Sequence, residues 1–427
     1  MDWLIKHSVS LYKDSDNKLI LFSPGARKIV VTTEKDYMAY LSSGSFKTVF
    51  DTLLDYTPIQ EQSHLRCPDD YYLLTILPNN ACNFNCSYCY SATGRNNSHL
   101  SLADLKATID YFFDTKPNGF NKPMTISFMG GGEPFLSWNL VMDGISYAKE
   151  KAMLRSFVFH PRIITNGSML DNKQIQYLHD NKVDMSVSFE ILKDIQNRQR
   201  KHYDIVKNNI LRLCEADISV QINSTVTASN VTMLEEMIEV LHLSFPSIKA
   251  AMFEPVTGQS LFRSTESMAV FYRLFIEHFF SARKKADEYG LSLTCFAYLR
   301  AMYPIIRACP GELCLTADGN LTGCYCVSSP KDALFERACY GKVSNRIVYI
   351  DKSKFARLIN DNVLSHKECE ECKVKWSCGG GCWYQYKSYD EEYQRVVCDF
   401  TRSFVEQMVL YKVHNNPSVD YPYVINI

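Results

Sequence analysis

Apolar and polar residues follow a strand–helix rhythm through the middle of the chain. Between residues 71 and 290, short apolar stretches typical of buried strands alternate with longer segments whose apolar residues recur at helical spacing. Parallel strands need a crossover connection, usually a helix, so six such units predict an α/β fold with a partial (β/α)6 barrel. The predicted strands are 73–77, 124–129, 157–164, 183–189, 218–225 and 248–253, and the predicted helices are 101–113, 138–152, 172–181, 203–216, 232–243 and 267–289.

Residues 1–65 predict a small separate module that precedes the barrel. Alternating apolar residues and turn-rich segments indicate three strands, two helices and a polar linker, at 8–12, 19–22, 29–33, 34–41, 45–54 and 61–70. A small sheet with an open edge can bind an extended peptide as an added strand. The competing interpretation is a cap that covers the main domain.

The region from 291 to 400 loses this rhythm and is rich in cysteine, and a closing helix is predicted at 401–414. The chain holds 16 cysteines in 427 residues, several of them at short spacings. Its N-terminus shows no basic segment followed by an apolar stretch, so we expect no export and no disulfides. Clustered thiols in a reducing compartment are typical of metal ligands, which predicts a cytoplasmic metalloprotein.

The charge balance gives no general attraction for polyanions. The 46 basic and 47 acidic residues leave a net charge of −1. Binding to nucleic acid or anionic lipid usually requires a basic surface, and no run of 18 apolar residues predicts a membrane span. We therefore expect neither nucleic acid nor a membrane as a partner.

Three cysteines lie close together in the loop after the first barrel strand. Cys82, Cys86 and Cys89 have the spacing C-x3-C-x2-C, and Tyr88 precedes the last thiol. A [4Fe-4S] cluster takes one ligand per iron, so three thiolates leave one iron open to another ligand. A zinc site or scattered buried thiols would be the competing interpretations.

A glycine-rich turn, GGGEP from Gly130 to Pro134, follows the second predicted strand. Glycines let the backbone turn tightly beside a ligand, and the Glu133 carboxylate suits an ammonium group. Alone, the segment reads equally well as a strand-to-helix turn. Because the two loops follow neighbouring parallel strands, we expect them to face each other at one edge of the sheet.

Together the two loops resemble the radical S-adenosylmethionine (SAM) superfamily, whose fold is a partial (β/α)6 barrel. The resemblance implies that the three cysteines hold a [4Fe-4S] cluster and that the amine and carboxylate of SAM bind its fourth iron. An electron from a small flavodoxin- or ferredoxin-type protein would then cleave SAM to a 5′-deoxyadenosyl radical. The residues implied in SAM binding are Tyr88, Gly131, Gly132, Glu133, Asn166, Ser188 and Arg200.

One stretch departs from the family pattern. The segment that starts at Ser188 resembles S-x-D-G followed by an arginine, but Glu190 and Ile191 replace the Asp-Gly pair. Arg200 keeps the family spacing and is expected to bind the SAM carboxylate, because a guanidinium pairs with a carboxylate through two hydrogen bonds. Arg198 is a competing candidate, and the role of Glu190 stays open.

The later cysteines resemble the SPASM extension, the auxiliary-cluster domain of peptide-modifying radical SAM enzymes. The matched pattern is C-x9-G-x4-C, then C-x2-C-x5-C-x3-C, then a final cysteine. Two structural zinc sites are the alternative, because thiolate tetrads suit both. The resemblance implies two auxiliary [4Fe-4S] clusters, three clusters in all, with the first on Cys309, Cys314, Cys324 and Cys382 and the second on Cys369, Cys372, Cys378 and Cys398. No catalytic acid or base is implied; Tyr325 and Cys326 are the candidates, and Cys67, Cys214, Cys295 and Cys339 are expected to be incidental thiols.

In this domain order, residues 1–65 resemble the winged-helix-like RiPP recognition element, which binds leader peptides by strand addition. The implied domains are a peptide-binding module at 1–65, the barrel at 71–290, the SPASM domain at 291–400, and a C-terminal helix and tail at 401–427. The implied function is a maturase that forms a carbon–carbon or thioether crosslink in a ribosomally made precursor peptide with a leader. Two alternatives remain: a sulfatase-maturing enzyme that produces formylglycine, although such relatives carry an aspartate where this chain has Tyr325, and a non-catalytic iron–sulfur scaffold that binds leaders.

Overall fold

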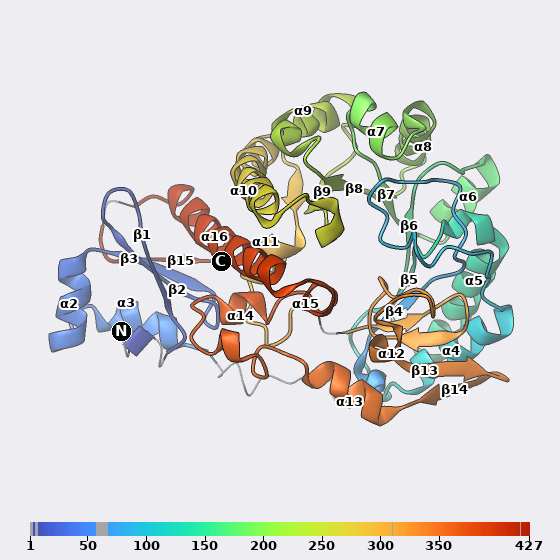
Figure 1. Ribbon diagram of the computed structural model, residues 1–427, viewed down its shortest axis with the longest axis horizontal. Helices are drawn as coiled ribbons and strands as arrows, with labels where there is room; N and C mark the ends of the chain where they lie inside the picture. The colour runs from blue at the N-terminus through green and yellow to red at the C-terminus, as the bar shows by residue number, and fades with distance from the viewer. Residues whose placement is uncertain (1–2, 5–6, 57–66, 310, 419) are drawn as a thin grey trace.

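The computed structural model describes residues 3–4, 7–56, 67–309, 311–418 and 420–427. Its larger sheet has the strand order β10-β9-β8-β7-β6-β5-β4-β11-β12-β13-β14, and the strands from β10 to β4 are all parallel (Figure 1). The predicted partial barrel is confirmed. Its strands are β4 (Leu73–Ile76), β5 (Met124–Phe128), β6 (Phe159–Thr165), β7 (Asp184–Ser188), β8 (Val220–Val226), β9 (Ala250–Pro255) and β10 (Ser292–Thr294).

The helices that follow these strands cover the outer face of the curved sheet (Figure 1). Two of them begin at caps that the sequence displays: the Ser101 hydroxyl accepts the Asp104 N–H, and Asp171 forms a capping box with Gln174. These caps fix where the loops after β4 and β6 end. The helices are α4 (Leu102–Asp114), α5 (Trp138–Arg155), α6 (Asn172–Asp180), α7 (Lys193–Gln199), α8 (Tyr203–Glu215), α9 (Leu234–Ser244) and α10 (Thr265–Glu288).

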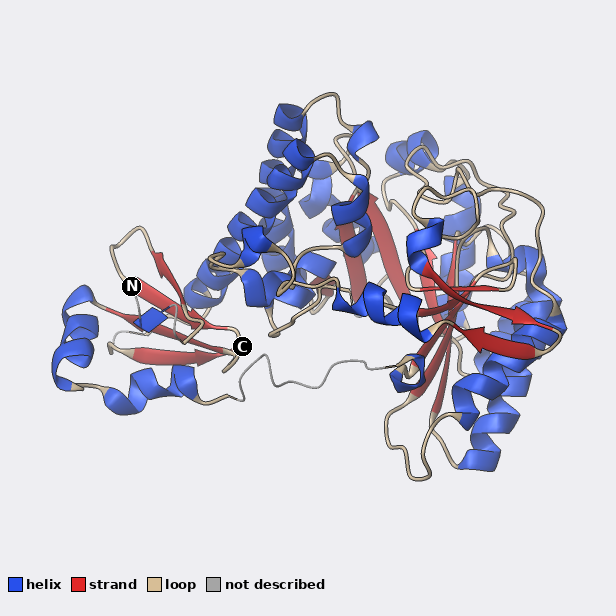
Figure 2. Ribbon diagram, turned by 60° about the horizontal axis from the view of Figure 1, so that its bottom comes forward, coloured by secondary structure: helices blue, strands red, loops and turns tan. Residues whose placement is uncertain are grey.

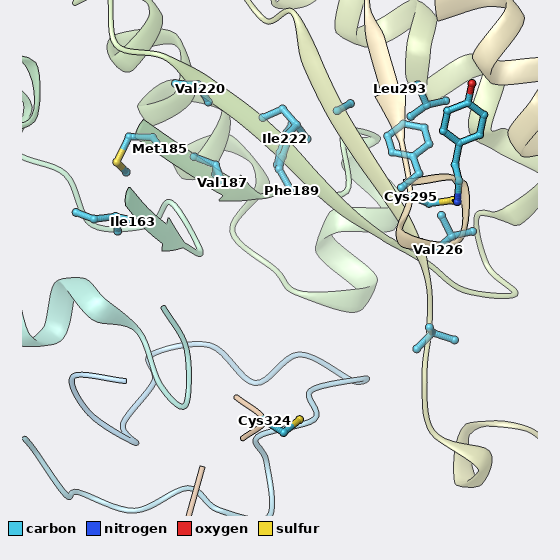
Figure 3. Packing of buried hydrophobic residues seen from close by; sticks show 14 of the residues in the cluster. Ile163, Met185, Val187, Phe189, Val220, Ile222, Val226, Leu293, Cys295 and Cys324 are labelled. Atoms are coloured by element: carbon cyan, nitrogen blue, oxygen red, sulfur yellow. The ribbon is translucent and has the colours of Figure 1, made fainter. Parts of the chain in front are cut away.

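Side chains alternate between the two faces of each barrel strand. Val187 and Ile222 are fully buried, and Figure 3 shows them in the packed layer that the barrel strands share with the helices. Their chain neighbours Ser188 and Asn223 are only partly buried and lie opposite each other, with Met252 of β9 next in line. Because successive residues of a strand point to opposite faces, this second row lines the inner face of the sheet. The inner face is therefore the accessible one.

The sheet continues beyond β4 into the cysteine-rich region (Figure 2). β11 (Leu313–Leu315) pairs parallel with β4, and β12 (Asn320–Thr322), β13 (Cys339–Ser344) and β14 (Ile347–Ile350) follow in antiparallel pairs. The sequence predicted no strands here; β11 and β12 have only three residues each and are too short to show alternation, whereas the longer β13 and β14 were missed among the cysteine-rich segments. β10 likewise lies beyond the expected barrel boundary at residue 290 and pairs with β9. Five short helices complete this region: α11 (Phe296–Ala301), α12 (Phe335–Ala338), α13 (Lys352–Asn360), α14 (Lys375–Cys378) and α15 (Trp383–Ser388).

The N-terminal module is a separate sheet with the strand order β1-β2-β3-β15. The predicted strands and helices are present as β1 (Ser10–Lys13), β2 (Leu19–Ser23), β3 (Lys28–Thr32), α2 (Glu34–Ser43) and α3 (Lys47–Phe50). The fourth strand, β15 (Tyr423–Asn426), comes from the other end of the chain and lies antiparallel to β3. The β3 edge, which the three-strand prediction left open, is therefore occupied. Residues 61–66 of the predicted linker lie outside the described residues.

The closing helix is longer than predicted, because α16 spans Glu391–His414. It packs along α10, where Phe404 contacts the rings of Phe275, Phe279 and Phe280. The helix α16 extends from the cysteine-rich region to the N-terminal sheet (Figure 1). In the part of the chain that the structure describes, no helix combines the length and the apolar character needed to cross a membrane.

Candidate active site

Each sulfur of the cysteine loop between β4 and α4 receives a hydrogen bond from a polar side chain. The donors are Asn166 Nδ2 to Cys82 at 3.9 Å, Arg200 Nη1 to Cys86 at 3.6 Å and Arg95 Nη2 to Cys89 at 3.4 Å. Burial raises the pKa of Cys82 and Cys86, and the Arg200 charge opposes the rise at Cys86. N–H groups directed at sulfur favour the thiolate that binds iron, and they tune the potential of a bound cluster. The three thiols and their donors fit an iron–sulfur cluster.

The glycine turn after β5 lies against the cysteine loop, as the sequence predicted. The Gly132 N–H donates to the Asn79 carbonyl at 3.0 Å, and the Glu133 N–H donates to the Ala81 carbonyl at 2.7 Å. A Cβ at Gly132 would stand only 1.8 Å from the Ala81 carbonyl oxygen, so only glycine permits this approach. Among the described residues, the buried amide of Asn80 has no hydrogen-bond partner at either polar atom, and its Oδ1 lies beside Gly131. An unpaired amide beside a glycine turn fits a polar ligand.

The carboxylate of Glu133 connects β5 to β6. It is 2% exposed and accepts hydrogen bonds from the Thr165 hydroxyl at 2.6 Å, the Asn166 N–H at 2.8 Å and the Phe135 N–H at 3.1 Å. Burial raises its pKa, and these donors oppose the rise. A carboxylate offers about four acceptor positions, so three protein donors leave roughly one for a ligand.

Glu190 organises the loop after β7. Its carboxylate is completely buried and accepts hydrogen bonds from Arg200 Nε at 3.1 Å, the Ser224 hydroxyl at 2.6 Å and the Thr225 N–H at 3.0 Å. The Tyr88 hydroxyl donates to the same carboxylate. Burial raises the pKa of Glu190, and the charge of Arg200 opposes the rise. Glu190, whose role the sequence left open, thus holds Arg200 and Tyr88 in place at the cysteine loop.

The structure separates the two competing arginines and places the remaining predicted SAM contacts. The Arg200 guanidinium lies 5.7 Å from the ring centre of Tyr88, whereas Arg198 is exposed on α7. Asn166, just after β6, reaches the cysteine loop, and Ser188 lies at the end of β7 on the inner face. Arg200 is therefore the arginine that belongs to this site.

The cysteines predicted for the first auxiliary cluster come together beside β11 and β12. Burial, followed by the charge of Cys324, raises the pKa of Cys309 to about 12, and Cys382 contributes as well. Cys314 is buried in β11 and also interacts with Cys324. The thiol of Cys326 forms a hydrogen bond with Cys324 that raises its pKa well above the usual range. Cys314 and Cys326 therefore both interact with Cys324 of this group.

A carboxylate that the sequence reasoning missed joins this group. Burial raises the pKa of Glu312 to about 8, and its charge acts on Cys309 and Cys314. Among the described residues, its Oε2 is buried without a hydrogen-bond partner. Glu312 lies between two cysteines of the pattern, but a lone acidic residue in a loop gave no signal of burial.

The cysteines predicted for the second auxiliary cluster form a group between α14 and α16. Burial, followed by the charges of Cys378 and Cys372, raises the pKa of Cys369 to about 12. Cys398, which α16 carries, interacts electrostatically with Cys372 and Cys378. Cys369, Cys372, Cys378 and Cys398 thus lie within electrostatic range of one another. Over the described ranges, no three or more His, Cys, Asp or Glu side chains converge on one metal ion.

Two tyrosines connect the cysteine loop with the first auxiliary group. The rings of Tyr90 and Tyr325 make an edge contact with centroids 5.8 Å apart and an interplanar angle of 63°. Tyr90 follows Cys89 and Tyr325 follows Cys324, so this contact joins the two groups of thiols. Tyr90 is nevertheless 38% exposed. Burial nonetheless raises the pKa of its hydroxyl well above the usual value, so the phenol end faces the protein interior.

Glu254, which the sequence reasoning also missed, lies at the end of β9 in register with Thr225 of β8. The Phe296 N–H donates to its carboxylate. Burial raises the pKa of Glu254 to about 7, although this N–H and the charge of Arg300 oppose the rise. The Thr225 N–H also donates to Glu190, which holds Arg200. Glu254 therefore lies one strand spacing, about 4.8 Å, from the strand residue that contacts Glu190. An acidic residue at the end of an apolar strand was the available signal.

The segment that contains the candidate site is similar to a known protein family. Residues 76–243 match the model of the radical SAM superfamily. This match covers the cysteine loop, the glycine turn and the Glu190–Arg200 segment. This segment of the chain is therefore similar to a radical SAM domain, and the match covers less than half of the chain.

Curated relatives match only parts of the chain well. The uncharacterized protein MJ0907 of Methanocaldococcus jannaschii is 26% identical over 190 residues, which are 42% of this chain and 63% of that protein. The radical SAM cyclopropyl synthase TigE of Paramaledivibacter caminithermalis is 27% identical over 156 residues, 33% of this chain and 31% of the synthase. The cysteine-type anaerobic sulfatase-maturating enzyme of Clostridium perfringens is 19% identical over 323 residues, 70% of this chain and 85% of that enzyme. The chain thus spans less than two thirds of the length of the first two.

Solved structures share the fold well beyond the barrel. The structure of anSMEcpe with bound AdoMet superposes with a TM-score of 0.64 at 16% identity and covers 81% of this chain and 99% of its own. Streptococcus suis SuiB bound to the precursor peptide SuiA superposes with a TM-score of 0.56 at 14% identity, covering 81% of this chain and 79% of its own. The shared fold therefore extends over most of the chain.

Proposed function

We propose that this protein is a cytoplasmic radical SAM maturase that closes a carbon–carbon or thioether crosslink in a ribosomally made precursor peptide. The observation that carries the proposal is the Tyr90–Tyr325 contact, which links the cysteine loop to the first auxiliary cysteine group. Two redox sites joined by neighbouring residues suit a reaction that removes a hydrogen atom and an electron from the same substrate. The fold shared with peptide-bound SuiB supports a peptide as that substrate.

The residues at the cysteine loop bind and orient the reactive groups. Cys82, Cys86 and Cys89 would hold one [4Fe-4S] cluster, and the glycine turn with Glu133 would receive the ammonium of SAM. Bound SAM and cluster supply the hydrogen-abstracting radical. Arg200, fixed by Glu190, keeps one donor on the cluster sulfur and is positioned to meet the SAM carboxylate.

Crosslink formation removes two hydrogens from the peptide. One leaves as a hydrogen atom, and the other leaves as a proton while one electron goes to an iron–sulfur acceptor. Cys309, Cys324 and Cys382, with Cys314 or Cys326, would hold that acceptor, and the C-terminal group of four cysteines would hold another cluster. Glu254 takes the proton, because its pKa near 7 lets a carboxylate accept and later release one at neutral pH.

A sulfatase-maturing reaction is the second candidate, favoured by the extent of the shared fold with anSMEcpe. Both reactions begin with hydrogen abstraction, so the products distinguish them. Formylglycine is an aldehyde, whereas a crosslinked peptide carries none. The presence of Tyr325 where sulfatase-maturing relatives have an aspartate argues for the crosslinking reaction.

The proposal is tested by anaerobic co-expression with short peptides encoded beside the gene, followed by mass measurement of each peptide. Loss of two hydrogens per modified site, with no reaction toward an aldehyde probe, is the expected result. The variant C82A/C86A/C89A should leave the mass unchanged, whereas Cys67→Ala, outside the three groups, should retain the modification. Modification by the triple variant would refute the assignment. Absence of 5′-deoxyadenosine after incubation with SAM and dithionite would favour a non-catalytic scaffold.

A further inference from the structure

The C-terminal strand β15 occupies the β3 edge of the N-terminal sheet. β15 pairs antiparallel with β3, with Tyr423 opposite Val31, Val424 opposite Val30, Ile425 opposite Ile29 and Asn426 opposite Lys28. The Ile427 N–H extends this ladder to the Arg27 carbonyl at 3.0 Å. An extended segment from nearly 400 residues away in sequence thus completes a small sheet by strand addition, the geometry by which sheets capture peptides.

Two consecutive side chains of β15 enter different apolar clusters on opposite faces of this sheet. Val424 packs against the core of the N-terminal module, which includes Leu21, Val30 and Phe50. Ile425 is 6% exposed and belongs to the main core. Asn426 is exposed. The β3 edge therefore selects for two adjacent apolar residues of a strand, preceded by an aromatic residue and followed by a polar one.

The segment between α16 and β15 has little regular structure. Residues 415–422 form no helix or strand where they are described, and they connect the end of α16 to β15. In β15 itself, Ile425 is buried, whereas Tyr423 and Val424 are only partly buried. Because α16 is anchored through its own contacts with α10, β15 can leave the sheet without unfolding α16.

We propose that the β3 edge is a binding site for an extended peptide of the pattern aromatic–apolar–apolar–polar, and that residues 415–427 are an internal ligand that an incoming peptide strand displaces. The natural peptide would be the leader of the precursor. This identification of the peptide rests on the proposed function, whereas the existence of the edge site does not. A tethered occupant competes at its effective concentration, commonly in the millimolar range, so it lowers the apparent affinity for any peptide that uses the same edge.

The probe for this site is a fluorescein-labelled synthetic peptide with the sequence of residues 415–427. Its binding is measured by fluorescence anisotropy against the full chain and against a chain shortened to residues 1–414. We expect saturable binding to the shortened chain and at least about tenfold weaker binding to the full chain. No binding to the shortened chain, with its far-UV circular dichroism intact, would overturn the proposal, as would equal binding to both chains.

Two proline variants of the full chain supply a matched pair. Ile427 and Arg27 form a hydrogen-bonded pair, and such pairs alternate along an antiparallel ladder, so the Ile425 N–H points toward β3 and the Asn426 N–H points away. Ile425→Pro should therefore release β15 and admit the probe, whereas Asn426→Pro should exclude it as the parent does. Equal probe binding by the two variants would contradict the model. If the probe binds but no peptide is ever modified, the maturase function fails while the edge site stands.

Discussion

Replacing Glu190 by glutamine tests whether this buried carboxylate positions Arg200. The substitution keeps the size of the side chain but removes the charge that faces Arg200 Nε at 3.1 Å, and it turns an NH2 group toward the donors Ser224 and Thr225. Removing one partner of a buried ion pair typically costs about 3–5 kcal/mol, because the other charge stays buried and uncompensated. Glu190 has no exposed surface, so solvent does not screen this loss, and we expect a destabilisation of about 3 kcal/mol or more.

The assay is anaerobic urea denaturation of the reduced apoprotein, combined with a double-mutant cycle. E190Q and R200Q together leave two neutral side chains, so the double variant should be more stable than the sum of the single losses by about 1–3 kcal/mol. Arg198→Gln removes the same charge from the exposed face of α7 and should change stability by less than about 0.5 kcal/mol. A loss below about 1 kcal/mol in E190Q, or additivity within about 0.5 kcal/mol, would refute the positioning role. SAM binding by equilibrium dialysis should fall in E190Q and stay unchanged in R198Q.

Three further substitutions probe the local geometry. Gly132→Ala places a Cβ 1.8 Å from the Ala81 carbonyl oxygen and should abolish SAM binding in equilibrium dialysis. In the control variant Gly130→Ala the nearest atom to the new Cβ is 3.3 Å away, so SAM binding should be retained. SAM binding by G132A would show that the turn is not rigid. Ile191 has a φ of +67°, a strained value for a β-branched residue, so Ile191→Gly should be more stable than Ile191→Ala by about 1 kcal/mol in urea denaturation, and the usual order with alanine ahead would contradict this. Burial raises the pKa of Glu254 from 4.5 to about 7, so the folded state favours the neutral carboxyl: its stabilising contribution is complete below pH 4.5 and disappears as the pH rises through 7. Glu254→Gln should therefore gain up to about 3 kcal/mol over the parent between pH 5 and pH 8, and a difference that does not change with pH would refute the shift.

The sequence predicted the parts of the fold that depend on local patterns. The barrel strands and their helices follow from apolar periodicity, and the cysteine loop and glycine turn face each other because neighbouring parallel strands end at one edge. β10 and β11 were missed because three residues cannot display a period. β15 was missed because strand pairing between residues 28–32 and 423–426 depends on the whole chain and leaves no local signal.

The candidate site divides in the same way. Cysteines at short spacing can be recognised in the sequence as candidate metal ligands. The roles of Glu190, Glu254 and Glu312 instead depend on burial and on partners distant in sequence. Sequence spacing alone did not decide between Arg198 and Arg200. The structure does, because Arg198 lies on the exposed face of α7 and Arg200 faces the cysteine loop. The Tyr90–Tyr325 contact joins residues 235 positions apart, and the sequence indicated only that each follows a cysteine.

The pairing of β11 with β4 has a consequence for the dimensions of any substrate. Leu313, Cys314 and Leu315 lie opposite Leu74, Thr75 and Ile76, and the Leu77 N–H continues the pairing to the Leu315 carbonyl at 2.9 Å. The two strands that lead to the cysteine loop and to the first auxiliary group are therefore held side by side by backbone hydrogen bonds rather than by particular side chains. The pairing thus fixes how far apart the loops that follow β4 and β11 begin, whatever the sequence of the loops around them. Under the proposed function, a substrate that reaches both cysteine groups would have to span this separation.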